Sequence, residues 1–202
     1  TFEPLPGAEA HFGVLGAAGY RIEIPDDWNG SLVLFAHGVR LFTNRLEVSE
    51  PLGPLRALLI EQGFAWAASS YSETFYVPGI GADDTMALLR HFEDQFRPPE
   101  AVYIIGESMG GNVVTLLLEH HPEEFAGALA VCGALGGEEQ IDYLLSWAVA
   151  AEFASGVALP IGEPIADPNA IGTALLRALG PPSLPTPEGL QFAGIIREIT
   201  GG

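Results

Sequence analysis

The sequence has 202 residues, 48% of them hydrophobic and 17% charged, which suffices for a globular domain with a sizeable core. Acidic residues outnumber basic ones 26 to 8, and the net charge of −18 would repel a phosphate backbone, which argues against nucleic-acid binding. No run of about 18 or more apolar residues occurs, so no membrane span is predicted.

The first 137 residues alternate strand-like and helix-like patterns, which predicts an α/β fold with a mostly parallel sheet and helices on both faces. Strands are expected at residues 19–24, 31–36, 64–70, 101–106 and 125–132, and helices at 51–62, 81–96 and 109–120. Cys132, the only cysteine, ends the last of these strands, and its apolar neighbours predict a buried thiol.

The pattern changes after residue 137. Helices are expected at residues 138–153, 169–179 and 187–200, separated by segments rich in Pro and Gly, and no strand signal returns. We therefore divide the chain into a core, residues 1–137, and an incomplete helical cap or lid, residues 138–202, whose apolar inner face would cover an active site.

A Gly-x-Ser-x-Gly turn lies between the strand predicted at 101–106 and the helix predicted at 109–120. Gly106 and Gly110 relieve crowding around the turn, so Ser108 can adopt a strained conformation with its hydroxyl exposed. Because the turn also starts a helix, the amide of Met109 points toward any oxyanion formed on a substrate held by Ser108. The motif therefore predicts a nucleophilic serine.

These features resemble the α/β-hydrolase superfamily, in its serine esterase and lipase branch. The elbow is Gly106-Glu107-Ser108-Met109-Gly110-Gly111, and Phe35-Ala36-His37-Gly38-Val39 is similar to the strand-end segment that supplies the second oxyanion-hole amide. The resemblance implies that Ser108 is the nucleophile and that the backbone amides of Val39 and Met109 bind the oxyanion. The resemblance covers residues 10–137 as core and 138–202 as cap. Within the core, it ends at the strand that corresponds to the sixth strand of the family's core.

The catalytic base that this resemblance requires is missing. A histidine should follow the nucleophile after an acidic residue, but the five histidines end at residue 121. We expect a chain cut within its cap, with the acid and histidine supplied by a separate C-terminal polypeptide that also covers the apolar sheet edge left after residues 125–132. The chain begins at Thr1 without a signal-like segment, so we expect a processed N-terminus, and secretion is one possibility.

Five residues near the carboxyl ends of two predicted strands are candidates for a substrate pocket. They are His37, Phe42, Tyr71, Phe75 and Tyr76. The expected substrate is a small apolar or aromatic ester. No residues have metal-ligand spacing and no loop has a nucleotide-binding pattern, so neither a metal nor a cofactor is predicted.

Several functions stay open. The primary hypothesis is hydrolysis of carboxylic esters through an acyl-enzyme on Ser108. The same serine could serve an acyltransferase or an amidase or peptidase, and a protein that has lost its base would be a non-catalytic binding protein. A further alternative is an N-terminal nucleophile hydrolase using Thr1, although the strand order and the elbow favour Ser108.

Overall fold

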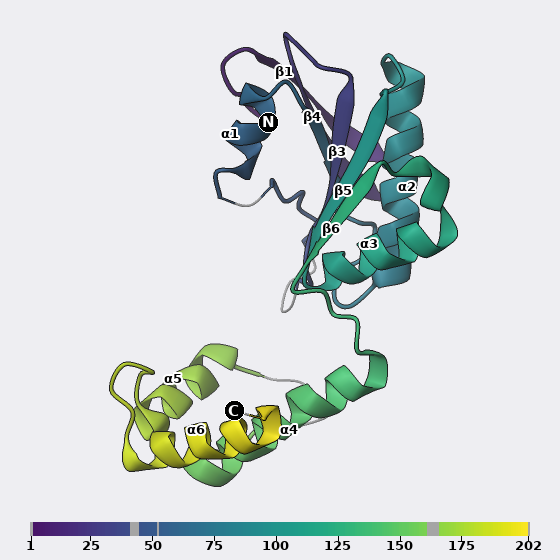
Figure 1. The fold of residues 1–202 in the computed structure, drawn as a ribbon. Coiled ribbons are helices and arrows are strands. Elements are labelled where there is room, and N and C mark those ends of the chain that lie inside the picture. The colour runs from purple at the N-terminus through teal and green to yellow at the C-terminus, as the bar shows by residue number, and fades with distance from the viewer. Residues whose placement is uncertain (1, 41–44, 52, 161–165, 202) are drawn as a thin grey trace. The chain divides into compact units, whose positions relative to one another are not determined.

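The computed structural model describes residues 2–40, 45–51, 53–160 and 166–201 (Figure 1). The chain divides into two compact units, Thr1–Leu135 and Gly136–Gly202. No helix within the described ranges combines the length and the apolar character that a membrane crossing requires.

The first unit is built on a six-stranded sheet in the order β1-β2-β4-β3-β5-β6. The strands are β1 (Ala8–Leu15), β2 (Ala18–Pro25), β3 (Ser31–Ala36), β4 (Ala65–Ser69), β5 (Ala101–Glu107) and β6 (Gly127–Val131). β2 runs antiparallel to both of its neighbours, β1 and β4, whereas β4, β3, β5 and β6 are parallel to one another. The carboxyl ends of β3 and β5 therefore meet at one edge of the sheet.

Helices cover both faces of this sheet, as predicted. α1 (Leu55–Glu61) lies on one face, and α2 (Pro78–Gln95) and α3 (Met109–His120) lie on the other (Figure 1). Alternate residues of β3 belong to different cores: Leu32 and Leu34 pack in the cluster that contains α2 and α3, while Val33 and Phe35 pack with α1. A strand buried on both faces must be apolar throughout, which is why residues 31–36 predict a strand so clearly.

No strand was predicted for the residues of β1, and the prediction that Cys132 is buried is wrong. β1 pairs with β2 through a tight turn at Gly16, whose φ is +62°, and the strand is only half-buried, so its apolar signal is weak. Cys132 is exposed rather than buried, because it follows an edge strand and leaves the sheet with a positive φ of 50°.

β6 forms the outer edge of the sheet among the described residues. Four of its five residues are exposed, including Leu129 and Val131, which are 54% and 39% exposed. A hollow of about 420 Å³ lies on the face of β5 and β6, lined by Leu129 and by apolar residues such as Val33 and Phe64. The expected apolar edge after residues 125–132 is therefore present.

The second unit consists of three helices that contact one another, α4 (Gly137–Ser155), α5 (Pro168–Leu179) and α6 (Pro187–Thr200). Side chains cap two of them: Asp167 accepts a hydrogen bond from the Ala170 amide at the start of α5, and Thr186 accepts one from the Gly189 amide at the start of α6, each at 3.0 Å. Such caps explain why these boundaries were predictable.

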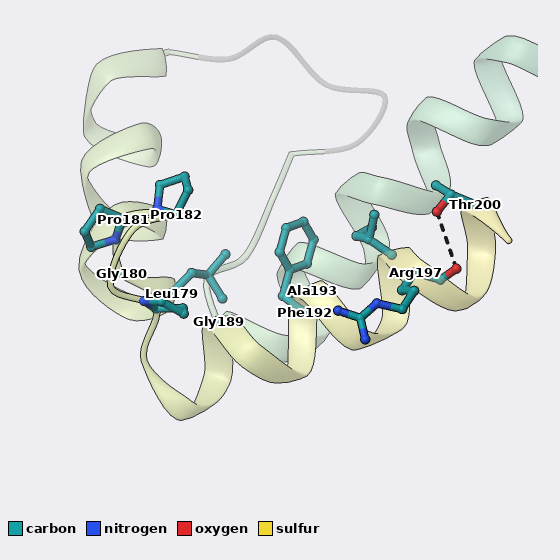
Figure 2. Close-up of a pocket in the computed structure, with 11 residues that line it drawn as sticks. Leu179, Gly180, Pro181, Pro182, Gly189, Phe192, Ala193, Arg197 and Thr200 are labelled. Carbon is teal, nitrogen blue, oxygen red and sulfur yellow. Dashed lines mark hydrogen bonds between the residues drawn. The ribbon is translucent and has the colours of Figure 1, made fainter. Parts of the chain in front are cut away.

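The predicted apolar face of α4 stays exposed on this unit, which leaves Leu144 and Val149 more than half accessible. A separate hollow of about 480 Å³ lies beside α6 (Figure 2). Pro181 and Pro182 border one end of it and Arg197 and Thr200 the other.

Candidate active site

Ser108 occupies the junction between β5 and α3 in a backbone conformation that L-residues rarely adopt. Its φ is 53° and its ψ is −118°, and the residue is exposed. A Cβ on Gly106 would lie 2.1 Å from the carbonyl oxygen of Gly110, and one on Gly110 would lie 2.0 Å from that of Ala36. Both glycines are therefore required for the turn to close, as the motif predicts.

Hydrogen bonds hold the backbone of Ser108 on both sides. Its amide donates to the carbonyl of Val131 at 2.9 Å, and its carbonyl accepts from the amides of Gly111 and Ala134, each at 3.0 Å. The loop that follows β6 is thus part of the elbow. A backbone fixed in this way can sustain the unfavourable φ of Ser108.

The two predicted oxyanion donors lie in segments that adjoin this position. The segment that contains Val39 lies beside the serine, since a Cβ on Gly38 would be 3.3 Å from the Cβ of Ser108. The amides of Val39 and Met109 have no acceptor among the described residues. The Met109 side chain is buried, and its sulfur accepts a hydrogen bond from the Val77 amide at 3.2 Å. Both amides therefore remain candidates for the oxyanion hole.

His37 is buried and its ring nitrogens face carbonyl oxygens. Nδ1 lies 2.7 Å from the carbonyl oxygen of Gly38, and Nε2 lies 3.2 Å from that of Ser70. Burial lowers the pKa of His37 below its ordinary value, against the opposing effect of these carbonyls. The neutral ring has one N–H and can donate to only one of these carbonyls, but the carbonyl oxygens lie against both nitrogens, so neither nitrogen is placed to accept a proton from Ser108 and His37 shapes the loop.

Tyr71 is fully buried in the core and does not line an open pocket. Its hydroxyl donates to the carbonyl of His37 at 3.1 Å, and its ring stacks on the imidazole at a centroid distance of 4.0 Å. Burial raises the pKa of its phenol well above the ordinary value. Tyr71 also has a positive φ of 57°, an uncommon backbone conformation for a tyrosine that the sequence does not reveal.

Phe75 and Tyr76 are both about half exposed and so remain candidates for contact with a substrate. The amide of Phe75 donates to the carbonyl of Arg40 at 3.2 Å, which joins its loop to the segment that follows the proposed oxyanion amide of Val39. The fifth candidate, Phe42, lies outside the described residues.

Sequence reasoning missed a polar cluster beside the elbow. The Nδ2 of Asn112 donates to the hydroxyl of Tyr76 and to the carbonyl of Ala134, both at 2.9 Å, and the Tyr76 hydroxyl donates to the same carbonyl at 3.3 Å. The available signal was the position of Asn112, four residues after Ser108 on the same helix.

The other histidines contact different parts of the first unit. His11 pairs with Glu9 and Phe96, and His91 packs against Tyr20. His120 lies at the far end of α3, about 18 Å along the helix from Ser108. No described histidine other than His37 adjoins the elbow. Within the described ranges, no three His, Cys, Asp or Glu side chains form a metal-binding group.

Comparison with protein families finds one matching model, described as serine aminopeptidase, S33, over residues 70–164. That range contains the elbow, the strand β6 and the first helix of the second unit. A comparison with curated proteins gave no match.

Three solved structures that are similar to this chain are described as peptidases, as peptidase-related or as an esterase/lipase. A candidate dipeptidyl aminopeptidase IV from Bacteroides ovatus matches with a TM-score of 0.50 and 13% identity, over 61% of this chain and 21% of its own. The proline iminopeptidase-related protein of Thermus thermophilus has a TM-score of 0.47 and 20% identity, over 96% of this chain and 67% of its own. An esterase/lipase from an uncultured bacterium has a TM-score of 0.47 and 17% identity, over 88% and 57%. The chain thus spans part of the length of each protein.

Proposed function

We propose that this chain, whose residues 70–164 match a serine aminopeptidase family model and which has a partial α/β-hydrolase fold, is the nucleophile-bearing part of an enzyme of the α/β-hydrolase superfamily, a serine hydrolase that cleaves carboxylic esters. The observation that carries the proposal is the strained, exposed backbone of Ser108 between two glycines that no larger residue could replace. A protein maintains such strain where the geometry is used.

The reaction would proceed by acyl transfer to Ser108. Its Oγ attacks the ester carbonyl carbon while a histidine takes the hydroxyl proton, and the carbonyl π electrons move onto oxygen to form the oxyanion. The amides of Val39 and Met109 donate to that oxyanion. Its collapse expels the alcohol, which receives the proton from the histidine. Water then attacks the acyl-enzyme with the same base, releasing the carboxylic acid and restoring Ser108.

The histidine and its acidic partner would come from a separate C-terminal polypeptide. Two observations support this: the ring nitrogens of His37 are engaged by carbonyls, and the apolar strand β6 is exposed. Gel and intact-mass analysis of the active protein would test it. We expect a second polypeptide that carries a histidine; full activity from a single species of this chain's mass would contradict the idea.

The second unit would act as the cap that binds the apolar part of a small apolar or aromatic ester. Its support is chemical: apolar side chains of α4 are exposed, and a mostly apolar hollow of about 480 Å³ lies beside α6. Such surfaces suit an acyl chain or an aromatic ring.

Ester turnover with a matched pair of serine variants tests the proposed function. Ser108→Ala should lower hydrolysis of a 4-nitrophenyl ester by about 10⁴-fold or more, because the nucleophile is lost. Ser31→Ala should leave turnover unchanged, since the Ser31 hydroxyl makes no hydrogen bond within the described residues. Ser31 is also the first residue of β3, at the end of the strand away from the elbow. Retained turnover in Ser108→Ala would refute the assignment.

Amide cleavage is a second candidate, favoured by the matching family model, which is described as a serine aminopeptidase. The same nucleophile and oxyanion donors would serve it, with an amine in place of the alcohol as the leaving group. Comparing kcat/KM for a 4-nitrophenyl ester and for aminoacyl 4-nitroanilides separates the two. Faster cleavage of the anilides would favour the peptidase.

A further inference from the structure

We propose that Tyr76 and Asn112 are positioning residues that aim the Met109 amide into the oxyanion hole by anchoring the loop after β6. The inference rests on the proposed function, because it assigns a role to residues around the same serine. Neither side chain would touch the reacting atoms. They would act through the backbone of Ala134 and Ser108.

The argument begins with the peptide bond between Ser108 and Met109. In a trans peptide the carbonyl oxygen and the amide hydrogen point in opposite directions within one plane. The carbonyl of Ser108 accepts from the amides of Gly111 and Ala134, each at 3.0 Å. Whatever fixes that carbonyl therefore fixes the direction of the Met109 amide hydrogen, which has no acceptor among the described residues.

One of the two anchors is an ordinary helical turn, but the other is not. Gly111 belongs to α3 itself, whereas Ala134 lies in the loop after β6, 26 positions after Ser108 in the sequence. That loop follows the edge strand β6 and Cys132, a residue with a positive φ. A loop at a sheet edge needs side-chain contacts to stay in place.

Asn112 and Tyr76 supply those contacts. The amide group of Asn112 uses both of its hydrogens, one toward the Tyr76 hydroxyl and one toward the Ala134 carbonyl. The Tyr76 hydroxyl donates to the same carbonyl, so the three groups close a triangle. Ala134 is thus held by its carbonyl while its amide holds Ser108.

Gly111 makes room for this arrangement. A Cβ at Gly111 would lie 2.6 Å from the Cα of Gly133, inside the distance that real side chains allow. The loop therefore packs directly on the first turn of α3, which places Ala134 within reach of the serine. This close approach is a second observation, independent of the hydrogen bonds, that ties the loop to the elbow.

Variants of the triangle should lower kcat and leave KM nearly unchanged. An oxyanion hole acts on the transition state, and loss of a whole donor costs on the order of 10²–10³ in kcat, so misdirecting one should cost about tenfold. Asn112→Ala should show this loss, with KM within about twofold. Tyr76→Phe should show a smaller loss, since Asn112 still donates to Ala134. Tyr20→Phe is the control for Tyr76→Phe, because the Tyr20 hydroxyl makes no hydrogen bond within the described residues. Asn29→Ala is the control for Asn112→Ala, because its side chain bonds to Gln62 and Ser31 at the start of β3, away from the elbow; both controls should leave kcat unchanged.

Two structural measurements separate positioning from general stability. In Asn112→Ala the residual dipolar coupling of the Met109 amide, which reports its direction, should change, and hydrogen exchange of the Ala134 amide should accelerate. Unchanged kcat, or a lower kcat with both measurements unaltered, would overturn the inference. If the wild-type protein hydrolyses no ester or amide, the proposed function fails, and the two NMR measurements still decide whether the triangle directs the Met109 amide.

Discussion

Ser108 shows how a single residue can carry both a cost and a function. Hydrogen bonds to its amide and its carbonyl, together with the glycines at positions 106 and 110, stabilise its φ of 53°. The motif made the turn predictable because only glycine fits positions 106 and 110. The burial of Tyr71 was not predictable, because its ring stacks on His37, 34 residues earlier, and its positive φ is not a local preference of tyrosine.

Ser108→Gly should be more stable than Ser108→Ala. Glycine adopts the φ and ψ of this position without strain, whereas alanine keeps the strained backbone, so we expect a difference of about 1 kcal/mol in the free energy of unfolding. Urea unfolding of the two inactive variants measures it. Equal stabilities would mean that the elbow is relaxed.

A buried ion pair joins β2 to α1, on the face of the sheet opposite to α2 and α3. Glu23 on β2 is fully buried and accepts hydrogen bonds from Arg56 of α1 at 2.8 Å, from the Trp66 indole of β4 at 2.6 Å and from the Leu5 amide at 2.6 Å. Burial raises the pKa of this carboxyl, but the donors outweigh it and hold the pKa below the ordinary 4.5. The charge therefore stabilises the fold.

Glu23→Gln should destabilise the first unit by about 3 kcal/mol at neutral pH, because Arg56 loses its buried partner. Glu93→Gln, in a more exposed pair with Arg90, is the matched control and should cost under about 1 kcal/mol. A lowered carboxyl pKa contributes stability above pH 4.5 and loses it as the pH falls through the folded-state pKa. Denaturant unfolding across this range should show the gap between wild type and Glu23→Gln shrinking below pH 4.5; a constant gap would contradict the account.

At the scale of elements, the spacing of apolar residues predicted the strands that are apolar throughout and the helices whose ends carry clear signals. The bounds of β3, α3 and α6 match the expected ranges, because their apolar spacing is regular and their ends carry clear signals. β1 was not predicted because its apolar and polar residues alternate only weakly, as in a half-buried strand at a sheet edge. The triangle of Tyr76, Asn112 and Ala134 escaped because it joins residues that only the completed sheet brings together.

At the scale of the whole molecule, the exposed strand β6 and the apolar helices of the second unit require explanation together. The first unit leaves an apolar edge, and the second leaves apolar faces on α4. Soluble proteins rarely expose such surfaces without a use for them. The proposal of a separate polypeptide and a substrate-binding cap accounts for both.

Leu129→Lys should reduce self-association of the isolated chain. A lysine on the exposed edge strand disfavours strand pairing, and the residue is 54% exposed, so folding should be little affected. Leu58→Lys on α1, 51% exposed and away from the edge, is the control and should not change association. Sedimentation velocity compares the wild type with the two variants. Equal association in all three proteins would show that self-association does not involve β6.

The central claim is that one serine is chemically activated, and a fluorophosphonate probe tests it directly. The active protein, with every polypeptide that accompanies it, is treated with the probe, digested and sequenced by tandem mass spectrometry. We predict a single phosphonylated residue, Ser108, and no labelling of Ser108→Ala. An unlabelled Ser108, or a label on a different residue that persists in Ser108→Ala, would contradict the assignment of this chain as a serine hydrolase.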